Sequence, residues 1–234
     1  MAHIEKKSSD VLEFFDIIFV PLMSDFESSK MTNGVYIPPI IHDSELPFVR
    51  ERLKVASETG IKYALLGNIS HLSLSKEAGL VPIGDFRLNV TNSYAKDEYR
   101  KLGVKDIVLS PELSVSMARD IRGGEVVMGK IPLMLTERCF VKENFSCSSC
   151  MNAAFSDRTG TKFPIIREWQ HRNIILNSIP TYMGDKKQEL TRAKIFHQHF
   201  IFTDEKPDEV IKLIDSYEKG APLASVRRIG SRGF

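Results

Sequence analysis

Three cysteines give the clearest chemical signal in this sequence, because all of them fall between positions 139 and 150. Cys139, Cys147 and Cys150 have the spacing C-x7-C-x2-C. A C-x2-C pair can place two thiolates on one metal centre, as in zinc and iron–sulfur sites. Three unrelated thiols are one alternative. A redox pair is another, but a loop-like stretch precedes Cys147 where a thioredoxin-like unit would have a strand. The spacing therefore favours a metal site.

The elements that would position these cysteines follow from the hydrophobic pattern, in which short apolar runs alternate with amphipathic stretches. Strands are predicted at 16–21, 34–38, 62–66, 81–90, 106–110, 125–128, 132–135, 174–177 and 199–203, and helices at 45–60, 71–79, 93–103, 114–121 and 207–219. Residues 2–4 would form one more strand at the start of the chain. This alternation predicts parallel β/α units.

The fold class expected from these units is α/β, with a TIM-like (β/α)8 barrel that fills residues 1–234 as a single domain. A doubly wound sheet is the runner-up, but it would place a glycine-rich phosphate loop after its first strand, and the sequence has none there.

Polar residues follow five of the predicted strands, which is where barrel enzymes carry their active sites. Helix N-caps also favour Ser, Thr and Asn, and caps would account for Ser93 and Ser110 but not for carboxylates. We expect one polar pocket, with Glu112 and Glu137 as candidate general bases. The candidate substrate-binding residues are Asn68, Asn89, Asn92, Arg138 and Asn177.

Several runs of the sequence resemble the collagenase-like peptidase family, which is family thirty-two of the peptidases of unassigned catalytic type. They are Gly84–Ser93, Leu109–Leu113, Ile131–Cys139, Asp157–Pro164, Ile175–Ser178 and Phe202–Glu205. The runs keep the family's order and are most similar to the second barrel half of its large bacterial members. The resemblance implies a TIM-like barrel with a cysteine-bound iron–sulfur cluster. Relatives include proteins required for oxygen-independent hydroxylation of transfer RNA, ribosomal RNA or ubiquinone precursors, and others described as collagenases or proteases.

The same resemblance implies a ligand set for the cluster. Cys139, Cys147 and Cys150 match three family cysteines, and His171 stands where the family has the fourth. Three thiolates and one imidazole suit zinc, and histidine replaces cysteine in some iron–sulfur centres. The family favours a 4Fe–4S cluster, with zinc as the alternative, in a cysteine-rich insertion at about 136–180 after the seventh strand. His171 could instead be a surface histidine in a polar loop.

Three classes of function are compatible with these residues. Redox or oxygen-independent hydroxylation chemistry, on RNA or a small aromatic molecule, makes the best use of thiolates beside a polar barrel mouth. A peptidase is the alternative, although no H-E-x-x-H or G-x-S-x-G motif is present. Cys139 acting as a nucleophile with His171 as its base would leave the other two cysteines without a role. The third class is a non-catalytic, metal-stabilised binding domain.

Composition and charge limit which partners and which cellular location we expect for this protein. With 32 Lys+Arg against 30 Asp+Glu, the net charge of +2 gives no strong nucleic-acid footprint. No long apolar run is present, so no membrane span is expected. The first residues lack an apolar signal core, and we expect a cytoplasmic location. A partner subunit or a missing N-terminal half could supply part of the site.

Overall fold

The computed structural model describes residues 14–28, 32–144 and 153–229, which divide into two compact units. The parallel-sheet unit contains the described residues of His3–Glu125 together with Gln188–Gln198. The antiparallel-sheet unit contains those of Val126–Lys187 and His199–Ile229. Both units contain helices as well as strands, so the predicted α/β class is confirmed. A closed barrel, and a single domain over 1–234, stay predictions. The strand predicted at 2–4 lies outside the described residues.

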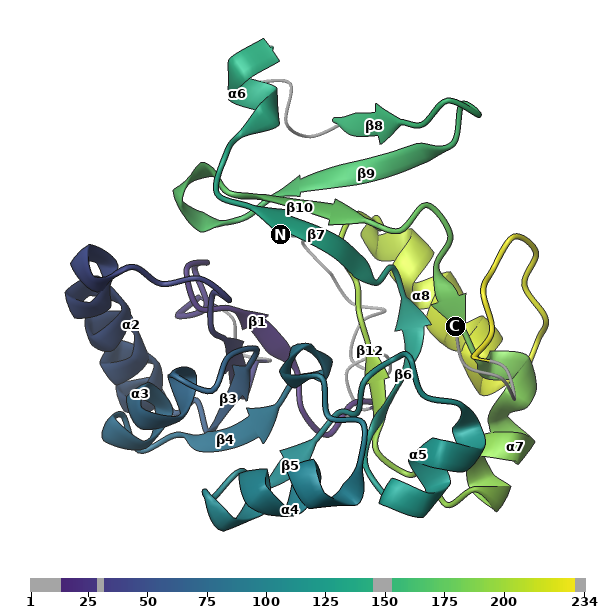
Figure 1. The fold of residues 1–234 in the computed structure, drawn as a ribbon, viewed down its shortest axis with the longest axis horizontal. Coiled ribbons are helices and arrows are strands. Elements are labelled where there is room, and N and C mark those ends of the chain that lie inside the picture. Colours follow the sequence, from purple (N-terminus) through teal and green to yellow (C-terminus); the bar gives the residue numbers. More distant parts are fainter. Residues whose placement is uncertain (1–13, 29–31, 145–152, 230–234) are drawn as a thin grey trace. The chain divides into compact units, whose positions relative to one another are not determined.

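Five parallel strands form the centre of the parallel-sheet unit, in the order β1-β2-β3-β4-β5 (Figure 1). They are β1 (Phe19–Pro21), β2 (Gly34–Tyr36), β3 (Tyr63–Leu66), β4 (Val81–Gly84) and β5 (Asp106–Ile107). The connecting helices are η1 (Asp43–Glu45), α2 (Leu46–Glu58), α3 (His71–Glu77), η2 (Phe86–Leu88), α4 (Ser93–Lys101) and α5 (Val115–Ile121). The predicted parallel β/α units are confirmed for this part of the chain.

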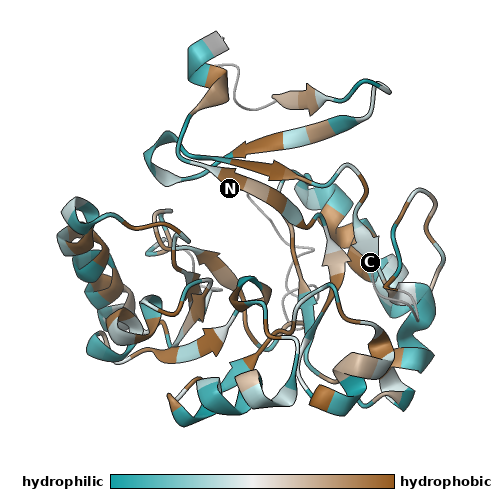
Figure 2. Ribbon diagram, viewed as in Figure 1, coloured by the Kyte–Doolittle hydropathy of each residue, from teal (hydrophilic) through white to brown (hydrophobic). Residues whose placement is uncertain are grey.

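Helix α2 shows how the sequence pattern builds this unit. Val49, Leu53 and Ala56 recur at helical spacing and are buried, while the opposite side of the helix is polar. Gly60 ends the helix with a φ of 91°, a conformation that other residues rarely adopt. Figure 2 shows both hydrophilic and hydrophobic residues on α2 and α4, as expected for helices with one buried side.

Strand β4 ends earlier than the apolar pattern predicts. The sequence indicates a strand over 81–90, but the chain leaves the sheet after Gly84 and enters the turn η2. The Asp85 carboxylate accepts the backbone N–H of Phe86 at 2.9 Å, and Asn89 adopts a left-handed conformation with a φ of 52°. The strand prediction is therefore wrong beyond Gly84, because a side-chain cap replaces the sheet hydrogen bonds.

The antiparallel-sheet unit contains a four-stranded sheet in the order β7-β10-β9-β8 (Figure 1). Its strands are β7 (Pro132–Thr136), β8 (Ala154–Ser156), β9 (Lys162–Arg167) and β10 (Asn173–Leu176). The expectation of parallel units is wrong here, since β7, β9 and β8 each pair antiparallel. The helix α6 (Phe140–Asn144) and the turn η4 (Trp169–His171) lie beyond the ends of these strands.

The remaining strands of the described residues form a three-stranded sheet in the order β11-β6-β12. The remaining elements are β6 (Glu125–Gly129), β11 (Thr181–Tyr182), η5 (Gly184–Lys186), α7 (Lys187–Arg192), β12 (Gln198–Phe200) and α8 (Pro207–Glu218). At the end of β6, Gly129 has a φ of 118°, and a Cβ atom there would overlap the carbonyl oxygen of Ile201. Only glycine therefore fits this position.

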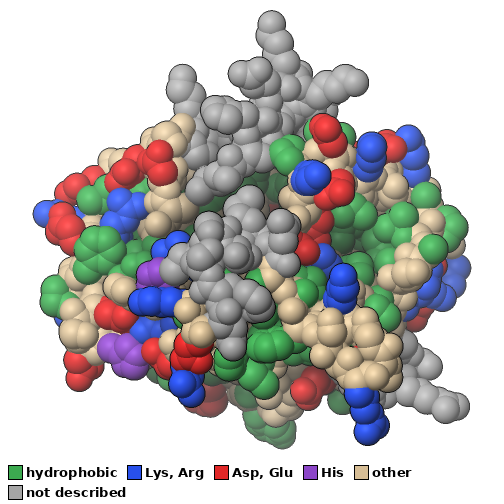
Figure 3. Space-filling view, turned by 90° about the horizontal axis from the view of Figure 1, so that it is seen from above, with side chains coloured by type: hydrophobic (Ala, Val, Ile, Leu, Met, Phe, Trp, Pro, Cys, Tyr) green, Lys and Arg blue, Asp and Glu red, His purple; other side chains and the backbone are tan. Residues whose placement is uncertain are grey.

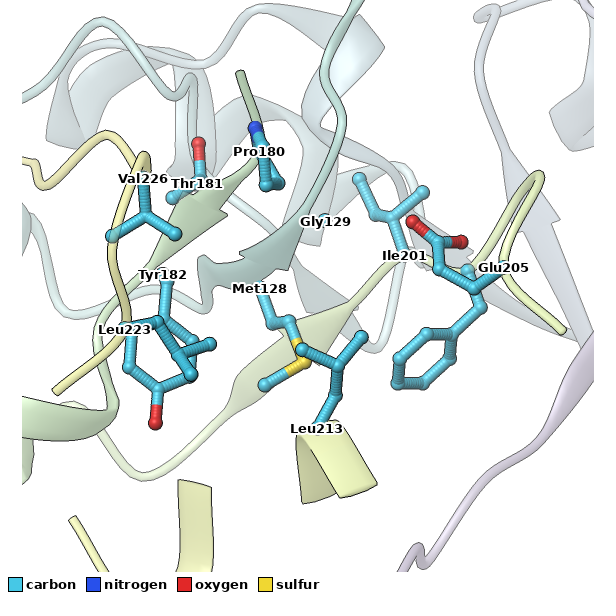
Figure 4. A pocket seen from close by; sticks show the side chains of 11 residues that line it. Met128, Gly129, Pro180, Thr181, Tyr182, Ile201, Glu205, Leu213, Leu223 and Val226 are labelled. Carbon is cyan, nitrogen blue, oxygen red and sulfur yellow. The ribbon is translucent and has the colours of Figure 1, made fainter. Parts of the chain in front are cut away.

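A small cavity of about 40 Å³ lies beside this sheet in the antiparallel-sheet unit (Figure 4). Its lining is almost entirely apolar and includes Met128, Ile201, Leu213, Leu223 and Val226. Such a lining is typical of imperfect core packing rather than of a polar ligand site.

No helix within the described ranges combines the length and the apolar character that a lipid bilayer requires. On the face drawn in Figure 3, acidic and basic side chains are interspersed rather than gathered into a patch of one sign. This mixture agrees with the near-balance of charges in the sequence.

Glu125, at the start of β6, is a buried carboxyl group. Neither of its carboxyl oxygens has a hydrogen-bond partner among the described residues. Burial disfavours the ionised form and raises the pKa of Glu125 from 4.5 to about 8. The folded protein therefore keeps this group protonated at neutral pH, whereas the unfolded chain releases the proton.

This difference predicts a pH-dependent stability penalty. Below pH 4.5 both states are protonated and Glu125 has no titration effect, while between pH 4.5 and about 8 the unfolded state gains stability as pH rises. Compared with wild type, Glu125→Gln should become more stable with increasing pH, by up to roughly 3 kcal/mol at pH 7. Urea unfolding at pH 5 and pH 7.5 measures this change. The exposed Glu51→Gln variant is the control for loss of a carboxylate, and a pH-independent effect of Glu125→Gln would contradict the prediction.

Candidate functional site

Arg87, which follows β4, is held by several contacts at the carboxyl ends of the parallel strands. Its Nε lies 2.8 Å from Asp85 Oδ2, and its Nη1 donates a hydrogen bond of 2.5 Å to the hydroxyl of Tyr36. The guanidinium carbon is 4.6 Å from the centre of the Tyr36 ring, which adds a cation–π contact. Tyr36 ends β2 and Asp85 follows β4, so neighbouring parts of the sheet fix the direction of this side chain.

Asp85 supports Arg87 from inside the protein, since the residue is 0% exposed. Burial raises the pKa of the Asp85 carboxyl, while the Arg87 charge and the backbone N–H groups of Phe86 and Arg87 oppose that rise. The ion pair therefore compensates part of the cost of burying a carboxylate.

His71, the first residue of α3, is a second polar group in this unit and is only 1% exposed. Its Nδ1 has no hydrogen-bond partner among the described residues. Burial, and then the positive charge of Arg87, lower the pKa of His71 from 6.5 to about 4. The imidazole is consequently neutral at physiological pH.

The predicted site residues of this unit lie in the loops after the strands. The Oδ1 of Asn68 accepts hydrogen bonds from the N–H and hydroxyl of Ser70, at 3.0 and 3.1 Å. Asn92 caps α4 by accepting the N–H of Ala95 at 2.8 Å. Asn89 ends η2, and both Asn89 and Glu112 are exposed. Capping explains the position of Asn92, while the substrate-binding and catalytic roles of these residues stay predictions.

In the antiparallel-sheet unit, the pairing of β7 with β10 brings Cys139 and His171 to the same end of two adjacent strands. Thr136 and Asn173 are Cα partners, and Cys139 follows the first as His171 precedes the second. Residues beyond such a pair leave an antiparallel ladder at the same end. Asn173 also accepts the backbone N–H of Phe140 at 2.9 Å, which ties the segment after Cys139 to β10.

An ion pair joins two residues that flank these predicted ligands in sequence, Glu137 before Cys139 and Arg172 after His171. Arg172 is 2% exposed and its Nε donates to Glu137 Oε1 at 2.7 Å, and its guanidinium carbon is 5.8 Å from the centre of the Trp169 ring. Next to Arg172, His171 adopts a left-handed conformation with a φ of 61°. Its Nδ1 is buried and has no partner among the described residues.

Cys139 is 8% exposed and packs with Val141, Ile165 and Ile175. Its sulfur accepts the backbone N–H of Lys142 at 3.4 Å. Cys147 and Cys150 lie outside the described residues. Within the described ranges, no three His, Cys, Asp or Glu side chains gather closely enough to hold a metal ion.

The two other predicted residues of this unit lie near the ends of the same strands. Arg138 is exposed, and its Nε forms an ion pair of 2.5 Å with Glu143. Asn177 follows β10 and donates its backbone N–H to the carbonyl of Ile131 at 2.9 Å. Their substrate-binding roles stay predictions.

Sequence reasoning missed the contacts that join Tyr36, Asp85 and Arg87. Two charged residues inside the apolar run 81–90 were the available signal, because buried parallel strands rarely carry them. Because the whole run was predicted as one strand, the turn η2, which places Asp85 and Arg87 at the carboxyl end of β4, was not predicted.

Comparison of the sequence with models of known protein families and with curated proteins finds no match.

The buried ion pair of Asp85 leads to a test of stability. Asp85→Asn leaves Arg87 without its counter-charge, and because the Arg87 side chain is still 26% exposed we expect a loss of about 1 to 3 kcal/mol. Urea unfolding at pH 7 measures the change. The matched control is Asp120→Asn, since Asp120 pairs with Arg119 at the surface and should leave the midpoint within error of wild type. Equal midpoints for the two variants would contradict the assigned role of Asp85.

Proposed function

We propose that this chain is a metal–thiolate protein of the redox class, in which Cys139, Cys147, Cys150 and His171 hold an iron–sulfur cluster. The observation that carries the proposal is the β7–β10 pairing, which places Cys139 and His171 at the same end of two adjacent strands. These two residues are far apart in sequence, so their common location is not a trivial result of spacing.

The donor atoms of the described residues fit this assignment. The His171 Nδ1 is buried and has no described partner, which is costly for a polar atom unless a ligand satisfies it. A backbone N–H directed at the Cys139 sulfur is also compatible with a thiolate ligand. A 4Fe–4S cluster is favoured by the resemblance to the collagenase-like peptidases, and a Cys3His zinc site is the alternative.

Residues around the proposed ligands would orient them and bind the substrate. When bound, an iron–sulfur cluster supplies one-electron transfer. Arg172 fixes the segment that carries His171, because its buried guanidinium is held by Glu137. Glu137 and Arg138 are exposed beside Cys139 and would contact the substrate, with Glu137 as a proton acceptor.

The proposed reaction class is oxygen-independent hydroxylation or related redox chemistry on RNA or a small aromatic molecule, within a TIM-like barrel and in the cytoplasm. The resemblance supports this class. A peptidase mechanism is less well supported, since Cys139 packs in an apolar cluster and a nucleophile must reach its substrate. Glu112 remains the second candidate base.

Anaerobic purification tests the proposal. The protein should be brown, absorb near ~400 nm and contain about four iron ions per chain. Cys139→Ser should lose most of the iron, and His171→Ala should lose part of it or change the spectrum. The control is His42→Ala, because His42 is an exposed histidine of the other unit.

Each alternative has its own outcome. Colourless protein with one zinc ion would refute the iron–sulfur assignment, and metal-free protein would refute the metal site. An unchanged iron content and spectrum in His171→Ala would remove His171 from the ligand set.

A further inference from the structure

Asn173, the first residue of β10, contacts both of the segments that carry Cys139 and His171. The residue is 1% exposed. Its Oδ1 accepts the backbone N–H of Phe140 at 2.9 Å, and Phe140 directly follows Cys139. Its Nδ2 donates to the backbone carbonyl of Arg172 at 3.2 Å, and Arg172 directly follows His171. One buried amide therefore joins the backbone beside one proposed ligand to the backbone beside the other.

The hydroxyl of Thr136, which is the Cα partner of Asn173, holds the Cys139 segment from its other side. It donates to the carbonyl of Arg138, which precedes Cys139, at 2.8 Å. The carbonyl of Asn173 lies farther away, at 3.4 Å, and a hydroxyl has only one hydrogen to donate. The backbone is thus fixed both before and after Cys139, at Arg138 and at Phe140.

His171 lies in the tight turn between β9 and β10, and this turn is closed at the same carbonyl (Figure 1). The N–H of Glu168 donates to the Arg172 carbonyl at 2.8 Å, so this oxygen accepts from Glu168 and from Asn173. Inside the turn, Gln170 and His171 have φ angles of 58° and 61°. Two consecutive positive φ angles are typical of type I′ hairpin turns, which favour asparagine and glycine. The turn itself therefore does not explain why position 171 is a histidine.

We propose that Asn173 is a positioning residue of the metal centre, whose buried amide keeps the Cys139 and His171 segments joined so that both side chains serve one metal. This inference rests on the proposed function and deepens it. Strand pairing brings the two segments to one end of β7 and β10, and the amide holds them together beyond the last paired residues. Ligands that are fixed before the metal binds lose less conformational entropy on binding. Thr136 has the same role for the Cys139 segment alone.

Substitutions of Asn173 separate this role from a general loss of stability. Asn173→Asp keeps the acceptor oxygen and loses the donor, whereas Asn173→Leu loses both at similar size. The matched control is Asn33→Leu in the other unit, because the Asn33 amide also joins two backbone groups. Its Oδ1 accepts the N–H of Ile18 at 2.9 Å, and its Nδ2 donates to the carbonyl of Asp16 at 2.9 Å.

The first measurement uses the full chain purified without oxygen, and compares bound iron per folded chain, absorption and the rate of iron loss to a chelator. Asn173→Leu should lose iron at least ~10-fold faster than wild type, as is usual when a residue that orients a metal ligand is removed. Asn173→Asp should lie between the two, and Asn33→Leu should match wild type. Wild-type iron content, spectrum and rate of loss in a folded Asn173→Leu protein would overturn the proposal. Zinc, if it replaces iron, is followed in the same way.

Thr136→Val gives the same test with a smaller change, for the case in which Asn173→Leu does not fold. It keeps the side-chain shape and removes the hydroxyl bond to Arg138. Thr181→Val is its control, since Thr181 is a buried threonine of β11 in the same unit. Faster metal loss in Thr136→Val than in Thr181→Val is expected, and equal rates would overturn the proposal.

A second measurement needs no metal. In a Cys147→Ser/Cys150→Ser background, Cys139 is the one cysteine left of three, so its reaction with a thiol reagent reports how often its segment opens. Asn173→Leu should raise this rate roughly 10-fold, because two buried hydrogen bonds are lost, and Asn33→Leu should not. An unchanged rate in Asn173→Leu would overturn the proposal.

The two measurements distinguish failure of this inference from failure of the proposed function. Metal in the wild type, together with unchanged metal loss and thiol reaction in Asn173→Leu, refutes the role of Asn173 and leaves the metal centre in place. Metal-free wild-type protein refutes the metal centre and with it the positioning role, and the thiol reaction then reports only whether Asn173 holds the Cys139 segment.

Discussion

The carboxyl end of the parallel sheet depends on one fully buried carboxylate. Asp85 ends strand β4 because its side chain takes the place of the next sheet partner for the backbone of Phe86. The same carboxylate needs a counter-charge once it is removed from water, and Arg87 provides it. One desolvated side chain thus determines where the strand stops, where the chain turns and which way the arginine points.

In the antiparallel-sheet unit, strand pairing brings together two segments that are distant in sequence. Among the described residues, α6, β8 and β9 lie between Cys139 and His171, and the Thr136–Asn173 pairing returns the chain to the end of β7 near Cys139. Arg172 reinforces this return, since its buried guanidinium joins the segment after β7 to the segment before β10. The positive φ of His171 indicates that local backbone preference was overridden there by tertiary contacts. Sheet pairing, rather than helix packing, therefore brings Cys139 and His171 to the same end of two strands.

Much of the parallel-sheet unit could be predicted from sequence, because its apolar runs and helix periods are local signals. Helix α2, for example, has buried residues at helical spacing and a glycine at its end. The antiparallel strands β8 and β9 were not predicted, since Ala154–Ser156 is exposed and Pro164 falls within Lys162–Arg167, where it weakens a strand signal. Whether these segments form strands depends on the neighbouring strands with which they pair, and the local sequence does not show those neighbours. The contacts around Arg87 were missed for a related reason. Hydrophobic periodicity identifies which residues are apolar, but it does not reveal that a side-chain cap stops a strand. The cysteine cluster was visible because its signal is composition at a fixed spacing, which needs no tertiary information.

Gly129 has a consequence for how this sequence can vary. The backbone of β6 passes so close to the Ile201 carbonyl that no Cβ atom fits between them. Every amino acid other than glycine carries that atom, so no change in polarity or size of the side chain offers a milder alternative. Any nucleotide change that alters this residue would push β6 away from the segment after β12, whichever amino acid it introduces. Selection at this codon would therefore act on the backbone spacing between β6 and Ile201. No conservative substitution is open to Gly129.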